Sequence, residues 1–358
     1  MSIREVRAHV VRVPLHTPFV TAIRTVHAVD SVLVEIVDGA GRAGWGEGAA
    51  TWKVTGDSVA SIEAAVTGPL RETVLGRHPD DLVAVCSAVE QAIVGNTAAK
   101  AAVDCALHDL AARRMGIPLP RLLGSGSLRV PTDVTLAAGP PQDMAVAAKK
   151  RLAEGFGVLK IKLGDGTADD VERLRLIRAT AGPAAVLRVD ANQGWTPRAA
   201  VRAIRAMEDA GLDLELVEQP VAAGDLDGLA FVTAHVSTPV LADESVWSAQ
   251  DLLEIIRRRA ADLVNVKLAK CGGIAPARRL LAVAQASGTG VLLGSMMETH
   301  VGLGAVASLA TVSRSAAVDD LDAAWWLSAS PVSGGLRYDG AHVVLPDAPG
   351  LGIDGLTS

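Results

Sequence analysis

Aromatic residues, paired cysteines and excess basic charge are all scarce in this chain of 358 residues. Aromatics make up 3%, which leaves few platforms for stacking on bases or sugars. The net charge is −6 without basic clusters, so we expect neither a nucleic-acid partner nor an anionic membrane surface. The three cysteines, Cys86, Cys105 and Cys271, form no CxxC pair, which argues against a disulfide framework or a zinc site.

The sequence also lacks a long uninterrupted apolar run. Its most apolar stretch, residues 291–311, is broken by Glu298 and His300, and charged residues occupy the first positions, where a signal peptide needs apolar ones. Hydrophobic residues nevertheless make up 49% and charged residues 21%, which excludes a disordered chain. We therefore expect a cytoplasmic enzyme with no membrane association.

The first third of the chain has the pattern of a small α+β domain. Residues 6–13 and 31–37 are rich in β-formers, and the Pro- and Thr-containing segment 14–27 between them is predicted to be a loop. Residues 58–115 are predicted to be helical, and Gly116-Ile117-Pro118 is a helix stop signal.

From about residue 130, short β-like runs alternate with helical patterns, which predicts a parallel sheet. Eight strands in this length fit a closed TIM-type barrel; an open doubly wound sheet is the alternative, disfavoured because no GxGxxG follows the first strand. The expected division is 1–122, 123–330 and 331–358, with the last segment folding back onto the first. The predicted strands are 132–136, 158–163, 186–190, 214–218, 240–243, 263–267, 291–294 and 318–322.

Five consecutive predicted strands end in an ionisable residue at nearly constant spacing. The five, separated by 24 to 28 positions, are Lys162, Asp190, Glu218, Asp243 and Lys267. One βαβ repeat has about this length. In a barrel, such positions form the C-terminal rim, where these enzymes keep their active sites.

This order of residue types suits proton transfer next to a carboxylate. Three carboxylates on adjacent strands match the oxygen ligands that Mg²⁺ prefers. The lysines on either side then face opposite sides of a metal-held substrate, so that Lys162 and Lys267 are the expected acid/base pair. A lysine base needs a pKa lowered toward 7, and Lys160 is expected to tune it and to stabilise the intermediate. Asn192 is either a second-shell neighbour of the metal or a turn residue.

At these residues the chain resembles the enolase superfamily, in its muconate-lactonising-enzyme subgroup. Lys160-Ile161-Lys162 is similar to the KxK motif of that subgroup; Asp190, Glu218 and Asp243 match its magnesium ligands, and Lys267 matches its opposing lysine. The resemblance implies an α/β fold: a modified (β/α)7β TIM barrel with an N-terminal α+β capping domain that the C-terminal segment completes.

Within that subgroup the chain most resembles the dipeptide epimerases. Asp320-Leu321-Asp322 is similar to their DxD motif, whose carboxylates hold the free α-ammonium of the substrate, although a solvated turn is an alternative. The segment 294–299, which contains Met297, is also similar to theirs, and Thr135 is expected to line the pocket. Arg24, in the loop 14–27, favours L-Ala-D/L-Glu as the dipeptide, because a guanidinium pairs with a carboxylate.

Other functions remain open from the sequence. N-acylamino acid racemase, o-succinylbenzoate synthase and muconate cycloisomerase belong to the same subgroup. A Schiff-base aldolase on the same barrel needs one lysine without aligned carboxylates, and a non-catalytic metabolite-binding relative would normally lose a lysine. A homo-oligomer is expected. Lys270 has the position of a helix-start surface residue.

Overall fold

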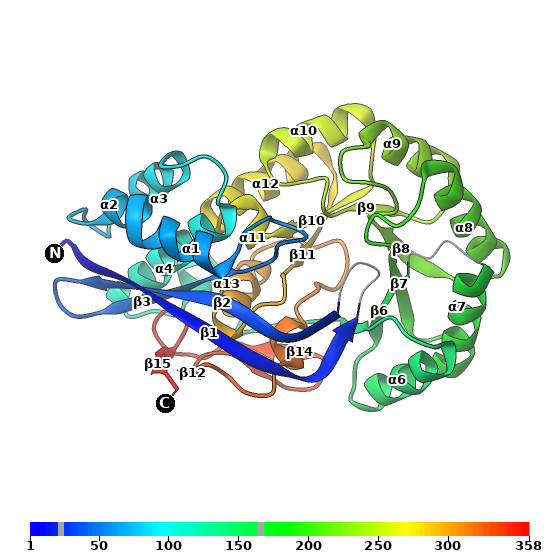
Figure 1. The fold of residues 1–358 in the computed structure, drawn as a ribbon, viewed down its shortest axis with the longest axis horizontal. Helices are drawn as coiled ribbons and strands as arrows, with labels where there is room; N and C mark the ends of the chain where they lie inside the picture. The colour runs from blue at the N-terminus through cyan, green and yellow to red at the C-terminus, as the bar shows by residue number, and fades with distance from the viewer. Residues whose placement is uncertain (21–24, 164–167, 358) are drawn as a thin grey trace.

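The computed structural model describes residues 1–20, 25–163 and 168–357. Its N-terminal part is an antiparallel sheet of β1 (Ile3–Val20), β2 (Thr25–Asp38) and β3 (Ala43–Ala49), in that order. The long β1–β2 hairpin runs from the N-terminal helices to the barrel (Figure 1). The predicted loop 14–27 is therefore wrong for residues 14–20 and 25–27. Pro14 pairs with Ala28 at the last position before the register of the two strands shifts. A proline is tolerated at such an irregular position of a strand.

Several helices follow this sheet, where the sequence predicted one helical stretch. They are α1 (Val59–Ala65), the π-helical turn η1 (Val66–Leu70), α2 (Arg71–Val74), α3 (Leu82–Gln91), α4 (Thr97–Met115) and α5 (Leu119–Leu123). The stretch predicted to be helical is divided into separate helices, in part because Gly68 leaves the helical region of φ/ψ space next to Pro69. The predicted stop is confirmed, since Gly116 ends α4 with a φ of 69°.

Helix α4 packs directly on β3 through glycines. A Cβ on Gly44 would lie 2.3 Å from the carbonyl oxygen of Ala106, and one on Gly46 would lie 2.0 Å from that of Ala102. The alternating Gly-x-Gly pattern of β3 therefore lets the Ala-rich helix approach the strand backbone to backbone. Glu47 alternates with these glycines and points to the other face of the sheet.

A curled parallel sheet of seven strands forms the barrel (Figure 1). Its strands are β5 (Val134–Leu136), β6 (Val158–Lys162), β7 (Val186–Asp190), β8 (Leu214–Glu218), β9 (Val240–Ala242), β10 (Leu263–Lys267) and β11 (Gly290–Gly294), in consecutive order. The predicted eighth strand is wrong as a strand: residues 319 and 320 form isolated bridges to Thr132 and Gly294. These bridges join the two edges of the sheet.

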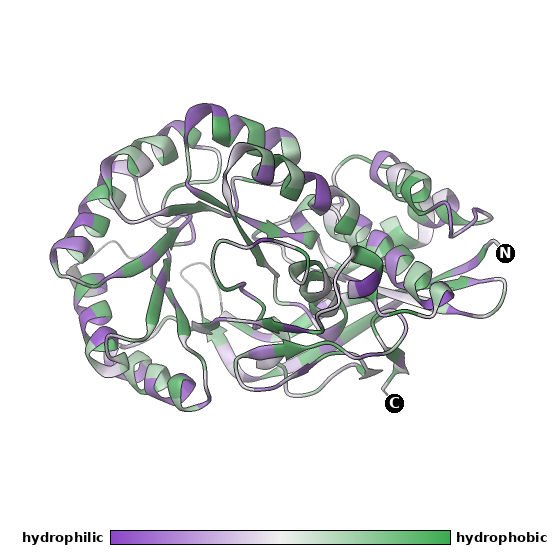
Figure 2. Ribbon diagram, turned by 180° about the vertical axis from the view of Figure 1, so that it is seen from behind, coloured by the Kyte–Doolittle hydropathy of each residue, from purple (hydrophilic) through white to green (hydrophobic). Residues whose placement is uncertain are grey.

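The helices of the barrel lie on the outside of this sheet, with apolar faces turned inward (Figure 2). They are α6 (Pro141–Ala153), α7 (Ala168–Ala181), α8 (Pro197–Asp209), α9 (Leu226–His235), α10 (Ala249–Arg258), α11 (Leu268–Cys271), α12 (Ile274–Ser287) and α13 (His300–Ala310), and η2 (Ala323–Trp326) follows. Two of these helices begin at recognisable start signals. Pro197 is the first residue of α8, and Ser248 caps α10 by accepting from the backbone N–H of Asp251.

The C-terminal residues return to the first part of the chain. They form β12 (Val332–Gly334), β13 (Arg337–Tyr338), β14 (His342–Val344) and β15 (Ile353–Leu356), and β14 pairs with β4 (Arg129–Pro131). The backbone N–H of Leu119 donates to Gly350, and that of Leu351 donates to the carboxylate of Asp109 in α4. Among the described helices, none combines the length and apolarity needed to cross a bilayer.

Candidate active site

The strand register brings the repeated ionisable residues side by side. Lys162 pairs in register with Asp190, and Asp190 pairs with Glu218 on the next strand. Asp243 follows the last residue of β9, and Lys267 ends β10. In the sheet order, β6 lies second from one edge and β10 second from the other, with β8 midway between them. The two lysines therefore flank the carboxylates, as the spacing predicts.

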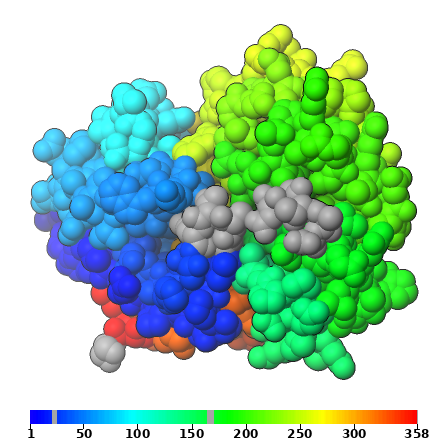
Figure 3. Space-filling model, turned by 45° about the vertical axis from the view of Figure 1, so that its right-hand side comes forward, coloured from blue at the N-terminus to red at the C-terminus, as the bar shows by residue number. Residues whose placement is uncertain are grey.

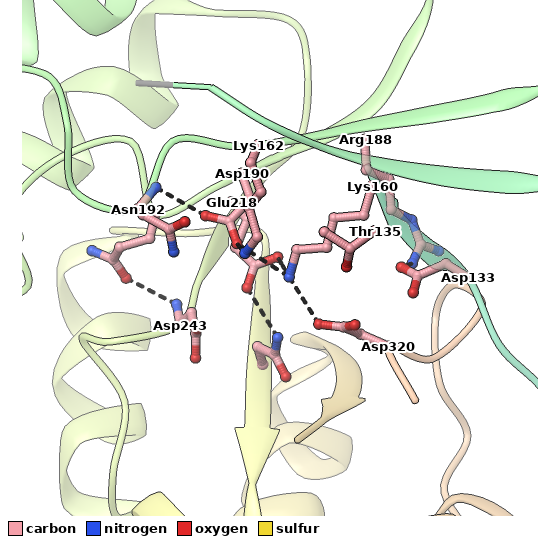
Figure 4. Close-up of polar contacts among 12 residues, drawn as sticks. Asp133, Thr135, Lys160, Lys162, Arg188, Asp190, Asn192, Glu218, Asp243 and Asp320 are labelled. Carbon is pink, nitrogen blue, oxygen red and sulfur yellow. Dashed lines mark hydrogen bonds and ion pairs between the residues drawn. The ribbon is translucent and has the colours of Figure 1, made fainter. Parts of the chain in front are cut away.

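Lys160 lies at the centre of the acidic cluster (Figure 4). Its Nζ is 3.2 Å from Asp190 Oδ2, 2.7 Å from Glu218 Oε2 and 2.8 Å from Asp320 Oδ2, and the side chain is 2% exposed. Burial works to lower the pKa of Lys160, but the carboxylates of Asp320 and Glu218 outweigh it and hold the pKa well above its ordinary value. The side chain is thus a buried, fixed positive charge.

Each flanking lysine is paired with one carboxylate. Lys162 Nζ lies 2.6 Å from Asp190 Oδ2, and Lys267 Nζ lies 2.7 Å from Asp243 Oδ2. Burial works to raise the pKa of Asp190, but Lys162 and Lys160 lower it to about 2. Burial works to lower the pKa of Lys267, but Asp243 raises it above its ordinary value. The direct contact with this carboxylate opposes the lowering that a lysine base needs.

Lys270 is not the surface residue that its position suggested. It is 1% exposed, and its Nζ lies 2.5 Å from Asp243 Oδ1 and 3.0 Å from the carbonyl oxygen of Asn265. Two ammoniums therefore share Asp243, one on each carboxylate oxygen. Sequence reasoning missed this contact, because the short helix α11 turns Lys270 back toward the strand ends.

Two amide side chains position the carboxylates and were also missed. Asn265 Nδ2 donates to Glu218 Oε1 at 3.0 Å, and Asn265 lies two residues before Lys267, on the same face of β10. Gln219 Oε1 accepts from the backbone N–H groups of Asp243 and Ser245, at 2.9 and 3.2 Å. Gln219 thereby ties the end of β8 to the segment that carries Asp243.

The backbone after two of these strands is left-handed at non-glycine residues. The φ angles are 43° at Asn192, 69° at Gln193 and 36° at Gln219. Such conformations cost about 1–3 kcal/mol each and persist where the surroundings fix them. Asn192 occupies such a turn, and its backbone N–H donates to Asp190 Oδ1 at 2.9 Å. The residue is therefore both a turn residue and a neighbour of a proposed ligand.

Asp320 and Asp322 are buried, so the solvated-turn alternative is wrong. They are 7% and 6% exposed. Asp320 contacts Lys160, whereas Asp322 Oδ2 accepts from the backbone N–H of Thr135 at 2.7 Å. Burial and the neighbouring Asp320 raise the pKa of Asp322, while this hydrogen bond works to lower it.

A cavity that is partly open to solvent lies over these residues. It is bordered by the β1–β2 hairpin and the barrel; Figure 3 shows the N-terminal segment (blue) adjoining the barrel (green). Its lining includes Phe19, Thr135, Lys160, Lys162, Asn192, Asp243, Lys267, Met297, Asp320 and Asp322. Arg24 lies outside the described residues.

Two family models match the chain. Residues 3–124 match the N-terminal domain of mandelate racemase / muconate lactonizing enzyme, and residues 143–355 match the enolase C-terminal domain-like family. Together with a curled barrel that carries two lysines around clustered carboxylates, these matches identify the class. The chain belongs to the mandelate racemase/muconate lactonizing enzyme family of the enolase superfamily.

Several relatives that match over the full chain are epimerases. The chain is 44% identical to the L-Ala-D/L-Glu epimerase of Bacillus subtilis, over 99% of this chain and 97% of the relative, and 42% identical to that of Clostridium acetobutylicum, over the whole of both. The substrate-liganded structure of the Bacillus subtilis enzyme matches with a TM-score of 0.97, 43% identity and full coverage of both chains. The dipeptide epimerase of Enterococcus faecalis, complexed with Mg and L-Leu-L-Tyr, matches with a TM-score of 0.94, 37% identity and 99% coverage of both.

Proposed function

We propose that this chain is a Mg²⁺-dependent dipeptide epimerase, an isomerase that moves a proton at the α-carbon of the C-terminal residue. The observation that carries the proposal is the placement of Lys162 and Lys267 on either side of the carboxylate cluster, both lining one cavity. Two amines on opposite faces of one carbon provide an acid and a base for inversion. Similarity to epimerases over the full chain supports the same activity.

The residues present fit a magnesium ion. Asp190, Glu218 and Asp243 supply three carboxylates on adjacent strands, and these are hard oxygen donors. Asn192 Oδ1 and Glu244 Oε2, close by, are buried without a hydrogen-bond partner among the described residues. When bound, Mg²⁺ supplies a dication that holds the substrate carboxylate and offsets the charge of the enediolate. Similar epimerases from Enterococcus faecalis and Cytophaga hutchinsonii are complexed with Mg, which supports this cofactor.

The lysines carry the proton transfer in this proposal. In one direction Lys162 removes the α-proton and the Lys267 ammonium donates a proton to the opposite face of the carbon; in the other direction the two lysines exchange these roles. Asp243 contacts Lys267 and would also hold the metal; a dication on this carboxylate would weaken its hold on the Lys267 proton. Lys160, fixed by three carboxylates, is placed to stabilise negative charge on the substrate carboxylate.

The acidic pair favours a substrate with a free amine. Lys160 contacts Asp320, whereas among the described residues no lysine or arginine forms an ion pair with Asp322, so Asp322 is the carboxylate that we assign to the substrate ammonium. A buried carboxylate without a cationic partner is costly, so substrates that lack an amine are disfavoured. N-acylamino acid racemase, o-succinylbenzoate synthase and muconate cycloisomerase are therefore the less favoured candidates.

The favoured substrate is L-Ala-D/L-Glu. Two relatives that share 42–44% of their residues with this chain are L-Ala-D/L-Glu epimerases, and Arg24 supplies a cation for the glutamate side chain in this proposal. Thr135 and Met297, which line the cavity, are proposed to contact the substrate.

A dipeptide library in D₂O, read by mass spectrometry, tests the function. We expect deuterium at one carbon with L-Ala-L-Glu and L-Ala-D-Glu, less with L-Ala-L-Leu, and none after EDTA. If no dipeptide exchanged its α-proton, the result would favour a non-catalytic metabolite-binding protein over an epimerase. Activity that survives EDTA and is trapped by borohydride would indicate a Schiff-base aldolase.

We further propose the division 1–122, 123–330 and 331–358, supported by the pairing of β14 with β4 and by the contacts of residues 350–351 with α4 and α5. We also propose a homo-oligomer in the cytoplasm; the absence of nucleic-acid and membrane partners in this proposal is supported by the net charge and the composition. Light scattering after size-exclusion chromatography and cell fractionation test it.

A further inference from the structure

Aromatic residues are scarce in this protein, yet several meet beside Asp322. The ring of Trp326 stacks on His16, with centroids 5.5 Å apart and an interplanar angle of 17°. Phe19 meets Trp326 edge to face at 5.2 Å. His16 and Phe19 belong to the end of β1, and Phe19 lines the cavity. Trp326, which is 4% exposed, therefore joins the tip of the N-terminal hairpin to the segment that follows Asp322.

The indole of Trp326 also contacts Asp322 directly. Its Nε1–H donates to Asp322 Oδ2 at 3.0 Å, and the backbone N–H of Thr135 donates to the same oxygen at 2.7 Å. Both hydrogen bonds fall on one oxygen of a carboxylate that lines the cavity. Two donors from different elements fix the side-chain rotamer of Asp322. The direction in which the other oxygen, Oδ1, points is thereby fixed as well.

We propose that Trp326 is a positioning residue that holds Asp322 in place for the substrate ammonium and links this anchor to the β1 end of the hairpin. The inference rests on the proposed function and deepens it. A salt link to the substrate forms at low cost only if the carboxylate is already oriented and ionised. The backbone donor of Thr135 is supplied by the fold, whereas the indole donor depends on this one side chain.

The charge on Asp322 depends on its surroundings as well as on Trp326. Titratable groups close to Asp322 or Trp326 are Asp320, Asp133, Lys160, Tyr338 and His16. Burial and Asp320 raise the pKa of Asp322, and the Trp326 hydrogen bond works to lower it. Loss of the indole donor therefore raises the pKa of Asp322 further, because the ionised form loses a hydrogen bond.

Trp326→Phe is the variant that tests the proposal, because it keeps a ring and removes the N–H. The ammonium contact exists in both the bound substrate and the transition state, so its weakening should raise KM and spare kcat. We expect KM for L-Ala-L-Glu to rise roughly tenfold, the typical effect of a lost charge-assisted hydrogen bond, with kcat within about threefold. The acidic limb of kcat/KM should move to higher pH.

Trp325→Phe is the matched control. The Trp325 ring packs against Phe156, His16 and Trp326, and the guanidinium of Arg151 lies 4.3 Å from its centroid. The backbone N–H of Trp325 donates to the carbonyl oxygen of Asp322, but among the described residues its indole makes no hydrogen bond to the Asp322 carboxylate. We expect wild-type KM and pH profile from this variant. Equal changes in both variants, or a Trp326→Phe enzyme with unchanged KM and acidic limb, would overturn the proposal.

A second variant keeps the proposal testable if Trp326→Phe does not fold. His16→Leu removes the ring stacked on Trp326 and keeps the indole donor, and we expect KM to rise about threefold by looser positioning. An unchanged KM would overturn the link to the hairpin. Wild-type enzyme that exchanges no dipeptide in D₂O would instead overturn the proposed function, so the two failures are distinguishable.

Discussion

Two sets of buried carboxylates in this protein are stabilised in different ways. At the strand ends, Asp190 and Asp243 contact lysine ammoniums. At the contact between the N-terminal part and the rest, Glu47 accepts from the backbone N–H groups of Thr299 and Gly302, and Asp104 accepts from that of Ile274. We call these the strand-end set and the contact set.

The partners of the two sets indicate different roles, a structural one for the contact set and a chemical one for the strand-end set. Backbone N–H groups at the starts of α12 and α13 cannot move or release a proton, so the contact set binds two helix N-termini firmly. Ammoniums can exchange a proton and can be displaced by another cation, so the strand-end set stays available for metal and substrate. The contact set therefore holds the N-terminal part over a site whose own charges remain exchangeable.

Loss of a flanking lysine should have the largest effect. Lys162→Ala and Lys267→Ala are each expected to reduce epimerisation by roughly 10³-fold, because general acid–base catalysis contributes about 10²–10⁴. One variant should retain α-deuterium exchange from a single stereoisomer, measured by NMR in D₂O. Lys149→Ala, an exposed lysine of α6, is the control. Normal epimerisation by either site variant would rule out the two-base scheme.

Substitutions in the strand-end set should lower the affinity for Mg²⁺, whereas substitutions in the contact set should not. Asp190→Asn is expected to weaken Mg²⁺ binding at least about 100-fold, because even the outer partners of a metal site contribute 10–100-fold. Isothermal titration of the apoprotein measures this. Asp104→Asn, from the contact set, should bind Mg²⁺ as the wild type does. An unchanged affinity in Asp190→Asn would remove Asp190 from the ligands.

The contact set should matter for stability and leave the chemistry alone. Asp104→Ala leaves the N–H groups of Ile274 and Ala275 without their acceptor, and we expect unfolding free energy to fall by about 2 kcal/mol. Urea unfolding measures this free energy, and we expect kcat per folded molecule to be unchanged. The control is Asp347→Ala, in an exposed ion pair with Arg121, which should change stability by less than about 1 kcal/mol. Equal losses in the two variants would contradict the comparison.

Glu298 should affect the pH dependence of stability. Burial and the neighbouring Glu47 raise the pKa of Glu298 to about 8, above the 4.5 of an ordinary glutamate. The folded state then holds more protons than the unfolded state between these values, so stability falls as pH rises from about 5 to 8, by at most about 1.4 kcal/mol per pH unit. Glu298→Gln should flatten this slope in urea unfolding at several pH values. A slope identical to wild type would show that another group titrates.

Much of the barrel was predictable because its signals are local or periodic. The strands β7, β8 and β10 occur at the predicted residues, and the even spacing of Lys162, Asp190 and Glu218 survives as direct register. The β1–β2 hairpin was mispredicted, because cross-strand pairing such as that of Phe19 with Val26 made strands of a Pro-containing segment. The predicted eighth strand is replaced by two isolated bridges. Residues 319 and 320 link the two edges of the sheet without forming a regular ladder of hydrogen bonds.

By itself the sequence determined the repeat that aligns lysines and carboxylates on consecutive strands, because a parallel βαβ repeat places equivalent residues at one edge of a sheet. Only the tertiary structure decided which charges pair. It buried Lys270 on Asp243, placed Lys160 among three carboxylates and brought the indole of Trp326 to Asp322. These contacts join side chains from separate elements, and their partners depend on rotamers and loop paths that no local pattern encodes.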